Sequence, residues 1–335
     1  MPVTQVAGNK AFTYVDNLGK IGVSEISFWH PVGLARGEDD VLYVLNWGYA
    51  NRPSARITKT YLTSQDWICD IGTAGSGAGE FLWPGGLAVD ENENLYVTDQ
   101  AISKVVSFTK DGEFISKWGV EGSGKGEFHM PTGIVLDQGE SFLIVDSRNN
   151  RIQRYTKDGS ILDQFGKQGQ SNGEFQLPWG IGLDLHRNIY VADWGNSRVQ
   201  KFDAHGKFIG TIGSPGIGEG ELDHPSDVTI DKDGDIYVAD WGNERVVVFE
   251  SDGTYLATLK GDATNLSRWA EAAVDANPEV QKARARVDLS PEWRFRRPSS
   301  IHIGDDYKIL IAEAQHMRVQ IYQKDPKYQE AQFTL

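Results

Sequence analysis

Short apolar runs separated by turn residues recur along the whole chain and predict β-strands. Each unit begins with a proline before an apolar run, and a second apolar run then ends in Asp, Asn or Glu. A third run begins with Arg or Lys. An Asp-Gly pair such as Asp158-Gly159 marks the hairpin to a fourth run, because Asp-Gly accepts the positive φ of a tight turn. The prolines that open the units are Pro31, Pro84, Pro131, Pro178, Pro225 and Pro298.

This repeat predicts an all-β fold, a six-bladed β-propeller of four-stranded antiparallel blades. One small sheet cannot bury both of its faces, whereas radial stacking of six sheets buries them and leaves only short edges. We expect a single propeller domain over residues 1–335, with blades that start at residues 31, 84, 131, 178, 225 and 298.

The two ends of the chain are expected to meet in the last blade. That unit has no fourth strand after Val319–Tyr322, whereas residues 15–20 match residues 162–167 and lie at the same distance from the next proline. Residues 11–20 are therefore predicted to supply the outer strand of blade six and close the ring.

The segment Tyr190–Val199, its near copy from Tyr237, and the Gly-Glu-Phe segments before several of the prolines resemble the NHL repeat. The resemblance covers roughly residues 11–323 and implies a propeller. It implies no single function, because this family includes enzymes, scaffolds and RNA binders, and a fold does not fix an activity.

Two spacings between the prolines are longer than the 47 residues that separate the middle units. The first spacing is 53 residues and the last is 73, and the extra residues fall in the loop 47–55 and in the insertion 262–297. In an up-and-down blade both loops lie on the face where the first strands begin, which we call the top face. Because long loops in compact domains are often functional, we expect a lid over a pocket, with a tolerated surface insertion as the alternative.

The larger insertion is predicted to be helical and basic. Asn277, Pro278 and Glu279 are typical of a helix start, and Val280, Ala283 and Val287 follow at helical spacing, so they would face the channel mouth. Residues 282–297 carry six Arg or Lys against two acids. This segment would be either an electropositive funnel for an anionic ligand or a solvated face paired with acidic neighbours.

Composition narrows the function classes. The chain has 33 Lys and Arg against 47 Asp and Glu, a net charge of −14, which argues against nucleic-acid binding. Cys69 is the only cysteine, so neither an internal disulfide nor a cysteine-based zinc finger can form. No apolar run approaches the ~18 residues of a membrane span, and the first residues lack a signal-peptide pattern. We therefore expect a cytoplasmic protein that binds neither nucleic acid nor membrane.

Polar exceptions to the repeat cluster in blades five, six and one. His224, Arg297 and His30 directly precede the prolines of these blades, where blades two to four carry apolar side chains. Two residues after the proline, four blades have glycine, but blades five and six have Asp227 and Ser300. This pattern predicts a pocket with one polar and one apolar half. The apolar half would consist of Trp83, Met130 and Trp179, while Trp47, Ser300 and Arg296 would also contact the substrate.

The candidate chemistry leaves two mechanisms open. His30, His224 and His302, with Asp227, would bind one divalent ion, either zinc, manganese or calcium. Alternatively His224 or His30 would act as acid or base, Asp227 would orient a histidine, and Arg297 would hold a carboxylate. Ordinary hydrogen-bonded loop histidines are the competing interpretation.

The NHL-like amidating lyases bind zinc through histidines that directly follow some of the prolines. Val32, Thr132 and Ser226 occupy such positions here, so that zinc site does not carry over. The sequence thus favours a lidded propeller that binds a small anionic or amphipathic organic ligand at its top face, as a hydrolase or lyase. The alternative is a non-catalytic protein-interaction or ligand-binding propeller with an open aromatic surface. The oligomeric state is left open.

Overall fold

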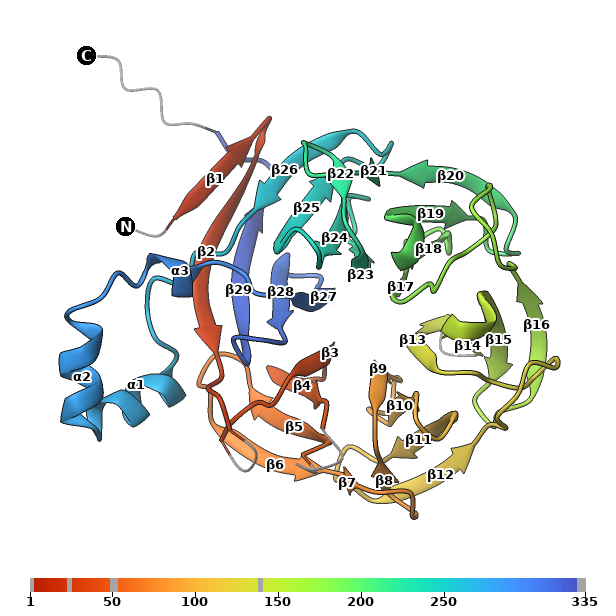
Figure 1. Cartoon of the computed structure of the whole chain (residues 1–335), viewed down its shortest axis with the longest axis horizontal. Coiled ribbons are helices and arrows are strands. Elements are labelled where there is room, and N and C mark those ends of the chain that lie inside the picture. Colours follow the sequence, from red (N-terminus) through yellow and green to blue (C-terminus); the bar gives the residue numbers. More distant parts are fainter. Residues whose placement is uncertain (1–2, 23–25, 49–53, 138–140, 330–335) are drawn as a thin grey trace.

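The computed structural model describes residues 3–22, 26–48, 54–137 and 141–329, and its sheets are arranged radially around a central channel (Figure 1). The strands of the first three blades are β3 (Pro31–Arg36), β4 (Val41–Asn46), β5 (Arg56–Tyr61) and β6 (Trp67–Ile71); β9 (Pro84–Val89), β10 (Leu95–Asp99), β11 (Lys104–Phe108) and β12 (Phe114–Trp118); and β13 (Pro131–Asp137), β14 (Ser141–Asp146), β15 (Arg151–Thr156) and β16 (Ile161–Phe165).

The remaining blades follow the same order from the channel outward. Their strands are β17 (Ile181–Leu183), β18 (Ile189–Asp193), β19 (Arg198–Phe202) and β20 (Phe208–Ile212); β23 (Pro225–Ile230), β24 (Ile236–Asp240), β25 (Arg245–Phe249) and β26 (Tyr255–Leu259); and β27 (Pro298–Ile303), β28 (Lys308–Glu313), β29 (Arg318–Asp325), β2 (Lys10–Leu18) and β1 (Thr4–Ala7). Short parallel pairs, β7 (Thr73–Ala74) with β8 (Glu80–Phe81) and β21 (Ser214–Pro215) with β22 (Glu221–Leu222), lie between blades. Two 3-10 turns, Ser147–Asn149 and Trp194–Asn196, follow β14 and β18.

The predicted six-bladed all-β architecture and its closure are confirmed. β2 pairs antiparallel with β29, from Ala11 opposite Asp325 to Leu18 opposite Val319. The sequence pattern missed β1, which pairs with β2 and makes blade six five-stranded. The first and last segments of the chain are therefore joined by a continuous hydrogen-bonded sheet.

The second strand of each blade is buried, apart from the partly exposed Lys308 of β28, because neighbouring blades pack on both of its faces. All five residues of β18 are buried, and an apolar cluster that includes Val145, Phe175 and Phe202 fills the space between blades three and four. Burial of each such side chain stabilises the fold by roughly 1.5–3 kcal/mol. This blade-on-blade packing fixes the positions of the inner strands.

A recurring ion pair holds the loops of the top face. Asp193, at the end of β18, accepts a hydrogen bond from the Gln176 backbone N–H at 2.8 Å and pairs with Arg198 Nε at 3.0 Å. Arg198 in turn donates to the carbonyl of Glu174 at 3.1 Å. Equivalent pairs form in blades three, five and six, between Asp146 and Arg151, Asp240 and Arg245, and Glu313 and Arg318. These carboxylates are thus engaged in the scaffold rather than available to a ligand.

Glycines let the inner strands approach the channel axis. A Cβ at Gly133 would lie 2.7 Å from the Trp179 carbonyl oxygen, and one at Gly180 would lie 2.5 Å from the Asp227 Cα. Hydroxyl groups bridge the same strands, since Thr132 donates to the Trp179 carbonyl and Ser226 donates to the Pro298 carbonyl, both at 2.8 Å. The inner strands consequently form a tight ring around the channel.

The insertion before blade six is helical, as predicted, but it does not cover the channel. Its helices, α1 (Arg268–Asp275), α2 (Pro278–Arg284) and α3 (Ser290–Trp293), lie at the outer side of the ring beside β2 (Figure 1). The Asn277 side chain caps α2 as expected, accepting from the Glu279 N–H at 3.2 Å. Val280 and Val287, which were expected to face the channel mouth, are exposed to solvent.

Contacts across the ring closure hold the insertion in this place. Trp269 is only 5% exposed, packs edge-on against Phe28 at 5.2 Å between ring centroids, and donates from Nε1 to the Gln65 carbonyl at 2.6 Å. Ser267 donates to the Gly19 carbonyl at 2.5 Å. The expected lid is therefore wrong for this helical segment, which instead braces the seam between blades six and one. Residues 49–53 of the other predicted lid loop lie outside the described residues.

Among the residues that the structure describes, no helix has the length and apolar character needed to cross a membrane.

Candidate functional site

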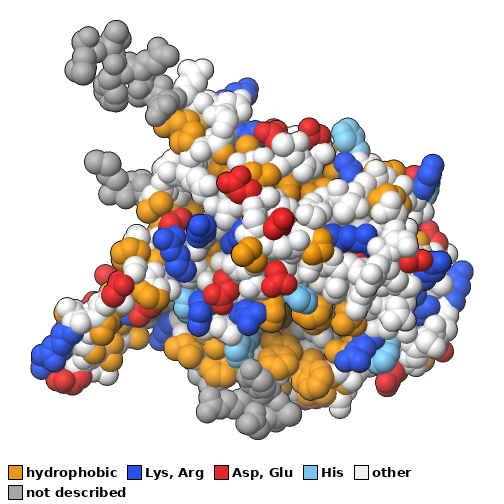
Figure 2. All heavy atoms as spheres, turned by 45° about the horizontal axis from the view of Figure 1, so that its top comes forward, with side chains coloured by type: hydrophobic (Ala, Val, Ile, Leu, Met, Phe, Trp, Pro, Cys, Tyr) orange, Lys and Arg blue, Asp and Glu red, His pale blue; other side chains and the backbone are white. Residues whose placement is uncertain are grey.

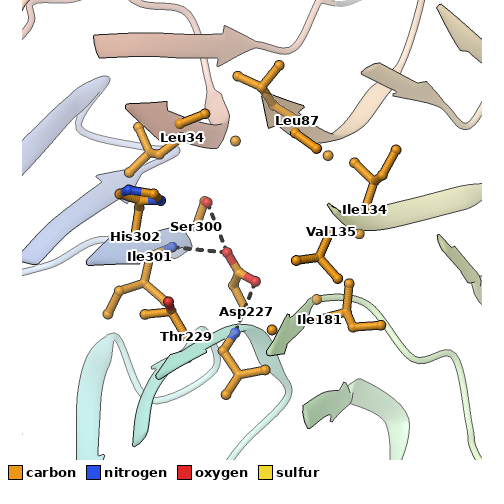
Figure 3. Close-up of a pocket in the computed structure, with 18 of the residues that line it drawn as sticks. Leu34, Leu87, Ile134, Val135, Ile181, Asp227, Thr229, Ser300, Ile301 and His302 are labelled. Atoms are coloured by element: carbon orange, nitrogen blue, oxygen red, sulfur yellow. Dashed lines mark hydrogen bonds between the residues drawn. The ribbon is translucent and has the colours of Figure 1, made fainter. Parts of the chain in front are cut away.

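The central channel contains a cavity of about 420 Å³, lined by residues of all six inner strands (Figure 3). These strands are β3, β9, β13, β17, β23 and β27. The glycines and hydroxyl bridges described above hold the backbones of these strands close together. The chemistry of the cavity therefore depends on the positions where a polar side chain replaces glycine, namely Asp227 and Ser300.

The cavity has a polar wall formed by blades five and six. Asp227 on β23 accepts hydrogen bonds at Oδ2 from Ser300 Oγ at 2.9 Å and from the Ile301 N–H at 3.0 Å (Figure 3). Its Oδ1 accepts from the Val228 N–H at 3.0 Å. Burial nevertheless raises the pKa of Asp227 to about 6, because three hydrogen bonds replace the water shell of the carboxylate incompletely. Asp227 therefore titrates close to neutrality within the channel.

His302 is the second titratable group of this wall. Burial, together with the positive charge of Arg36, lowers the pKa of His302 to about 4, so the ring is neutral at pH 7. Within the described part of the chain, neither ring nitrogen takes part in a hydrogen bond or an ion pair. Since His302 lines the cavity, its ring can donate one hydrogen bond to a ligand and accept another.

Apolar side chains form a large part of the remaining lining, together with glycines and a few hydroxyl groups. Leu34, Leu87, Ile134, Val135 and Ile181 project from blades one to four (Figure 3). The predicted substrate contact Trp179 also lines the cavity. A ligand that matches this channel has an apolar body and presents its polar group to blades five and six.

The structure separates the predicted site residues into two layers. Asp227, Ser300, His302 and Trp179 line the channel, whereas the other candidates lie outside its lining, on the top rim or beyond it. The rim and outer residues are His30, Trp47, Trp83, Met130, His224, Arg296 and Arg297.

One arc of the rim is aromatic and joins blades one and two. Trp47 lies 6.2 Å from His30 and 6.3 Å from Trp83 between ring centroids. Trp83 is 41% exposed, and burial lowers the pKa of His30 below its ordinary value. This aromatic arc lies on the rim and outside the cavity lining, whereas Trp83 was expected to form part of the apolar half of the pocket.

A second arc joins blades four, five and six. The Trp194 ring packs at a tilted angle against His224, 4.1 Å away, and Trp241, 6.3 Å away between ring centroids, and the Arg297 guanidinium lies 3.7 Å from the centre of the Trp241 ring. His224 Nδ1 is 2.5 Å from Asp223 Oδ1. Arg297, expected to hold a carboxylate in the pocket, is thus placed by an aromatic ring at the rim (a cation–π contact).

The basic insertion forms no funnel above the channel. Arg284 pairs with Glu292 at 2.8 Å, Lys282 with Glu279 at 2.9 Å, and Arg296 with Glu244 at 3.4 Å. These contacts match the solvated, paired face that was the alternative in the sequence interpretation, and Figure 2 shows basic and acidic side chains next to each other on the projecting helical segment.

The three histidines proposed as metal ligands are not brought together. His30 and His224 directly precede their inner strands, whereas His302 lies five residues deeper than the equivalent Arg297, ~16 Å along a strand. Among the described residues, which include all three histidines and Asp227, no group of three or more His, Cys, Asp or Glu side chains is placed to hold a metal ion. The residues present do not fit the predicted metal site.

Metal analysis tests this conclusion directly. Protein purified without chelator is expected to carry no stoichiometric zinc, manganese or calcium, because the ligand set is incomplete. The measurement is elemental analysis of the wild type beside a His224→Ala/His302→Ala variant, and both should give the same background. About one metal per chain that disappears in the variant would restore the metal site.

Sequence reasoning missed most of the apolar lining, the polar lining residues Arg36 and Thr229, and the depth of His302. Arg36 and Thr229 line the cavity, and His302 belongs to its lower half rather than to the mouth. The sequence does contain the information on how deep each residue lies in the channel. Successive residues of an inner strand are ~3.3 Å apart, so the number of residues after the proline gives the depth.

Comparison with known proteins identifies the architecture. A family model described as 6-bladed beta-propeller matches residues 91–165 and 183–276, together half of the chain. No curated protein matches the sequence. A structural genomics protein of unknown function from Bacteroides thetaiotaomicron has a similar structure, with a TM-score of 0.67 and 19% sequence identity over 94% of this chain and 76% of that one.

Two solved enzymes share the fold at lower identity. A gluconolactonase from Xanthomonas campestris gives a TM-score of 0.62 and 14% identity over 97% of this chain and 95% of that one. Virginiamycin B lyase from Staphylococcus aureus gives 0.57 and 14%, over 93% and 99% of the two chains. At such identities these similarities show the fold alone.

Proposed function

We propose that this chain, which belongs to the 6-bladed beta-propeller family, binds in its central channel a small organic molecule with an apolar body and an uncharged or cationic polar group. One observation carries this proposal. Asp227 is the acidic residue among those that line the cavity, apolar side chains lie across from it, and its carboxylate is held by Ser300 and the Ile301 N–H while it faces the channel. An amine or hydroxyl group would bind beside it through a charge-assisted hydrogen bond.

The sequence analysis expected an anionic ligand in this pocket, whereas the ligand proposed here has an uncharged or cationic polar group. Arg297, the candidate anion ligand, stacks on Trp241 at the rim. A carboxylate beside Asp227 would meet a like charge above pH 6, which disfavours binding. An ammonium or hydroxyl group meets no such repulsion.

A second candidate function is acid–base catalysis, as a hydrolase or lyase. Two residues of the polar wall favour it. Asp227, with a pKa of about 6, accepts protons near neutral pH, and His302 offers free ring nitrogens in the same cavity. In such a reaction Asp227 would take a proton from the substrate, and Ser300 would keep the carboxylate oriented. The gluconolactonase and lyase of the same fold are compatible with this candidate.

Asp227→Asn is the variant that tests the channel. We expect it to weaken binding of an alkylamine at pH 7 by about ten-fold or more, since a hydrogen bond to a charged group contributes ~1.5–3 kcal/mol. The measurement is calorimetric titration of both proteins. Asp223→Asn, which removes a carboxylate at the rim, is the matched control and should bind like the wild type. Equal affinity of Asp227→Asn and wild type would exclude the channel as the binding site.

The same variant is not expected to lose stability at pH 7. The folded-state pKa of Asp227 lies above its unfolded value, so the folded protein binds this proton more tightly and loses stability as pH rises from about 4 to about 6. Removing the charge raises the free energy of unfolding at pH 7 by up to roughly 3 kcal/mol, and the hydrogen bond that the Asn NH2 group cannot accept offsets about 1–3 kcal/mol of this gain, so no net loss is expected. If Asp227 served only to stabilise the fold, the variant would instead have a lower free energy of unfolding at pH 7.

A further inference from the structure

Arg36 stands at the lower end of the channel with unused hydrogen-bond donors. It is the last residue of β3 and lines the cavity. Its Nη1 donates to both oxygens of Asp306, at 2.9 and 2.8 Å. In the described residues, Nε and Nη2 donate no hydrogen bond, although an arginine carries five N–H groups in a planar fork. One side of this guanidinium is therefore free to bind a planar anion.

The charge of Arg36 is only partly neutralised by its partner. Asp306 also lies 3.7 Å from Lys308 Nζ and accepts the Lys308 backbone N–H at 3.2 Å, so two cations share one carboxylate. The remaining positive charge reaches the cavity, because Arg36 lowers the pKa of His302 more than Asp306 raises it. The lower end of the channel thus favours an anion, in contrast to the Asp227 level.

The register of the inner strands sets the separation of these two sites along the channel axis. Asp227 is the third residue of β23 and Arg36 is the sixth residue of β3, counted from prolines at equivalent positions. Three residues correspond to ~10 Å along the strand direction. Leu34 and Val228 are among the apolar residues that line the cavity between the two levels.

We propose that the channel ligand is dipolar, with an amine or hydroxyl group at Asp227, an anionic group such as a carboxylate at Arg36, and an apolar segment between them. This assignment rests on the proposed function, because it assumes that the channel is the binding site. It adds a second recognition group and gives the ligand a length and an orientation. The class that fits is the ω-amino or ω-hydroxy acids of medium chain length.

Titration with three matched compounds tests the proposal. Hexylamine carries only the cation, caproate only the anion, and ε-aminocaproate both; γ-aminobutyrate is a shorter dipolar control. We expect ε-aminocaproate to bind at least about ten-fold more tightly than hexylamine or γ-aminobutyrate, because it alone engages both ends. Calorimetry at low salt provides the affinities.

Variants at the lower end separate recognition from structure. Arg36→Gln should reduce the affinity for ε-aminocaproate to that for hexylamine and leave hexylamine binding unchanged. Asp306→Asn removes the competing carboxylate and should strengthen ε-aminocaproate binding, whereas it would weaken binding if the ion pair only held the loop. Thermal unfolding of each variant verifies that it is folded.

The outcomes distinguish this inference from the proposed function. If hexylamine binds and ε-aminocaproate binds no better, the channel site stands and the anion site at Arg36 is overturned. If the affinity of ε-aminocaproate is unchanged in Arg36→Gln, the anion site is likewise overturned. If none of the compounds binds the wild type, the dipolar ligand and the proposed channel site both fail.

Discussion

Replacing Trp269 by alanine is expected to lower the free energy of unfolding by about 3–5 kcal/mol, the usual cost of removing a large buried aromatic side chain. Trp269 belongs to an apolar cluster that combines Leu18 of β2, Phe28, and Leu42 and Val44 of blade one. These residues come from the two blades that close the ring. The substitution would therefore weaken the contact between blades six and one. Along the chain, these two blades are connected by residues 19–30, between β2 and β3.

Urea unfolding followed by circular dichroism measures this loss. Val287→Ala is the matched control, since Val287 belongs to the same insertion but is 60% exposed, and its unfolding free energy should change by less than about 0.5 kcal/mol. The folded fraction of Trp269→Ala should bind the channel ligand like the wild type, because the insertion lies outside the cavity lining. Wild-type stability of Trp269→Ala would show that the insertion does not brace the ring.

Lys324→Met is expected to be the other strongly destabilising change, with a loss of about 3–5 kcal/mol at pH 7. The ammonium group of Lys324 is completely buried and contacts three carboxylates of the hairpin between β23 and β24. Its Nζ lies 2.5 Å from Asp231, 2.9 Å from Asp235 and 3.1 Å from Asp233. Without this cation, Lys10 alone would remain close to the cluster, 2.8 Å from Asp235.

The pH dependence of this loss has a definite sign. In the variant, the crowded carboxylates would repel one another without their main counter-charge, and protonation at lower pH would relieve this repulsion. Their ionisation then costs stability as pH rises, and the deficit relative to wild type should shrink between pH 7 and pH 5. In the wild type, the raised pKa of Lys324 adds stability below its unfolded value, which is lost only at strongly alkaline pH.

Chemical unfolding at the two pH values compares Lys324→Met with Lys327→Met, in which an exposed lysine nearby is replaced. The control should differ from wild type by less than about 0.5 kcal/mol at both pH values. A loss in Lys324→Met that is small, or that grows on acidification, would contradict the role of Lys324 as the internal cation of this hairpin.

The features that sequence reasoning predicted correctly depend on residues close together along the chain. Strands with apolar runs, Asp-Gly hairpins and the helix start at Asn277 follow from backbone preferences and local hydrogen bonds. Even the closure by residues 11–20 was accessible, because it required only that a missing strand match a segment of another unit. The general resemblance to NHL repeats pointed to the same architecture, while membership of that particular family stays a prediction.

The features that sequence reasoning missed depend on contacts between distant residues. The insertion lies outside the ring because Trp269 finds a buried place beside Phe28 and Gln65, which no local pattern announces. Likewise, the pKa of Asp227 follows from burial within a ring of six strands, and the separation of His302 from His30 and His224 follows from strand register. Repeat patterns therefore specify the blades and their order, whereas burial, charge pairing and depth in the channel arise only when the blades pack together.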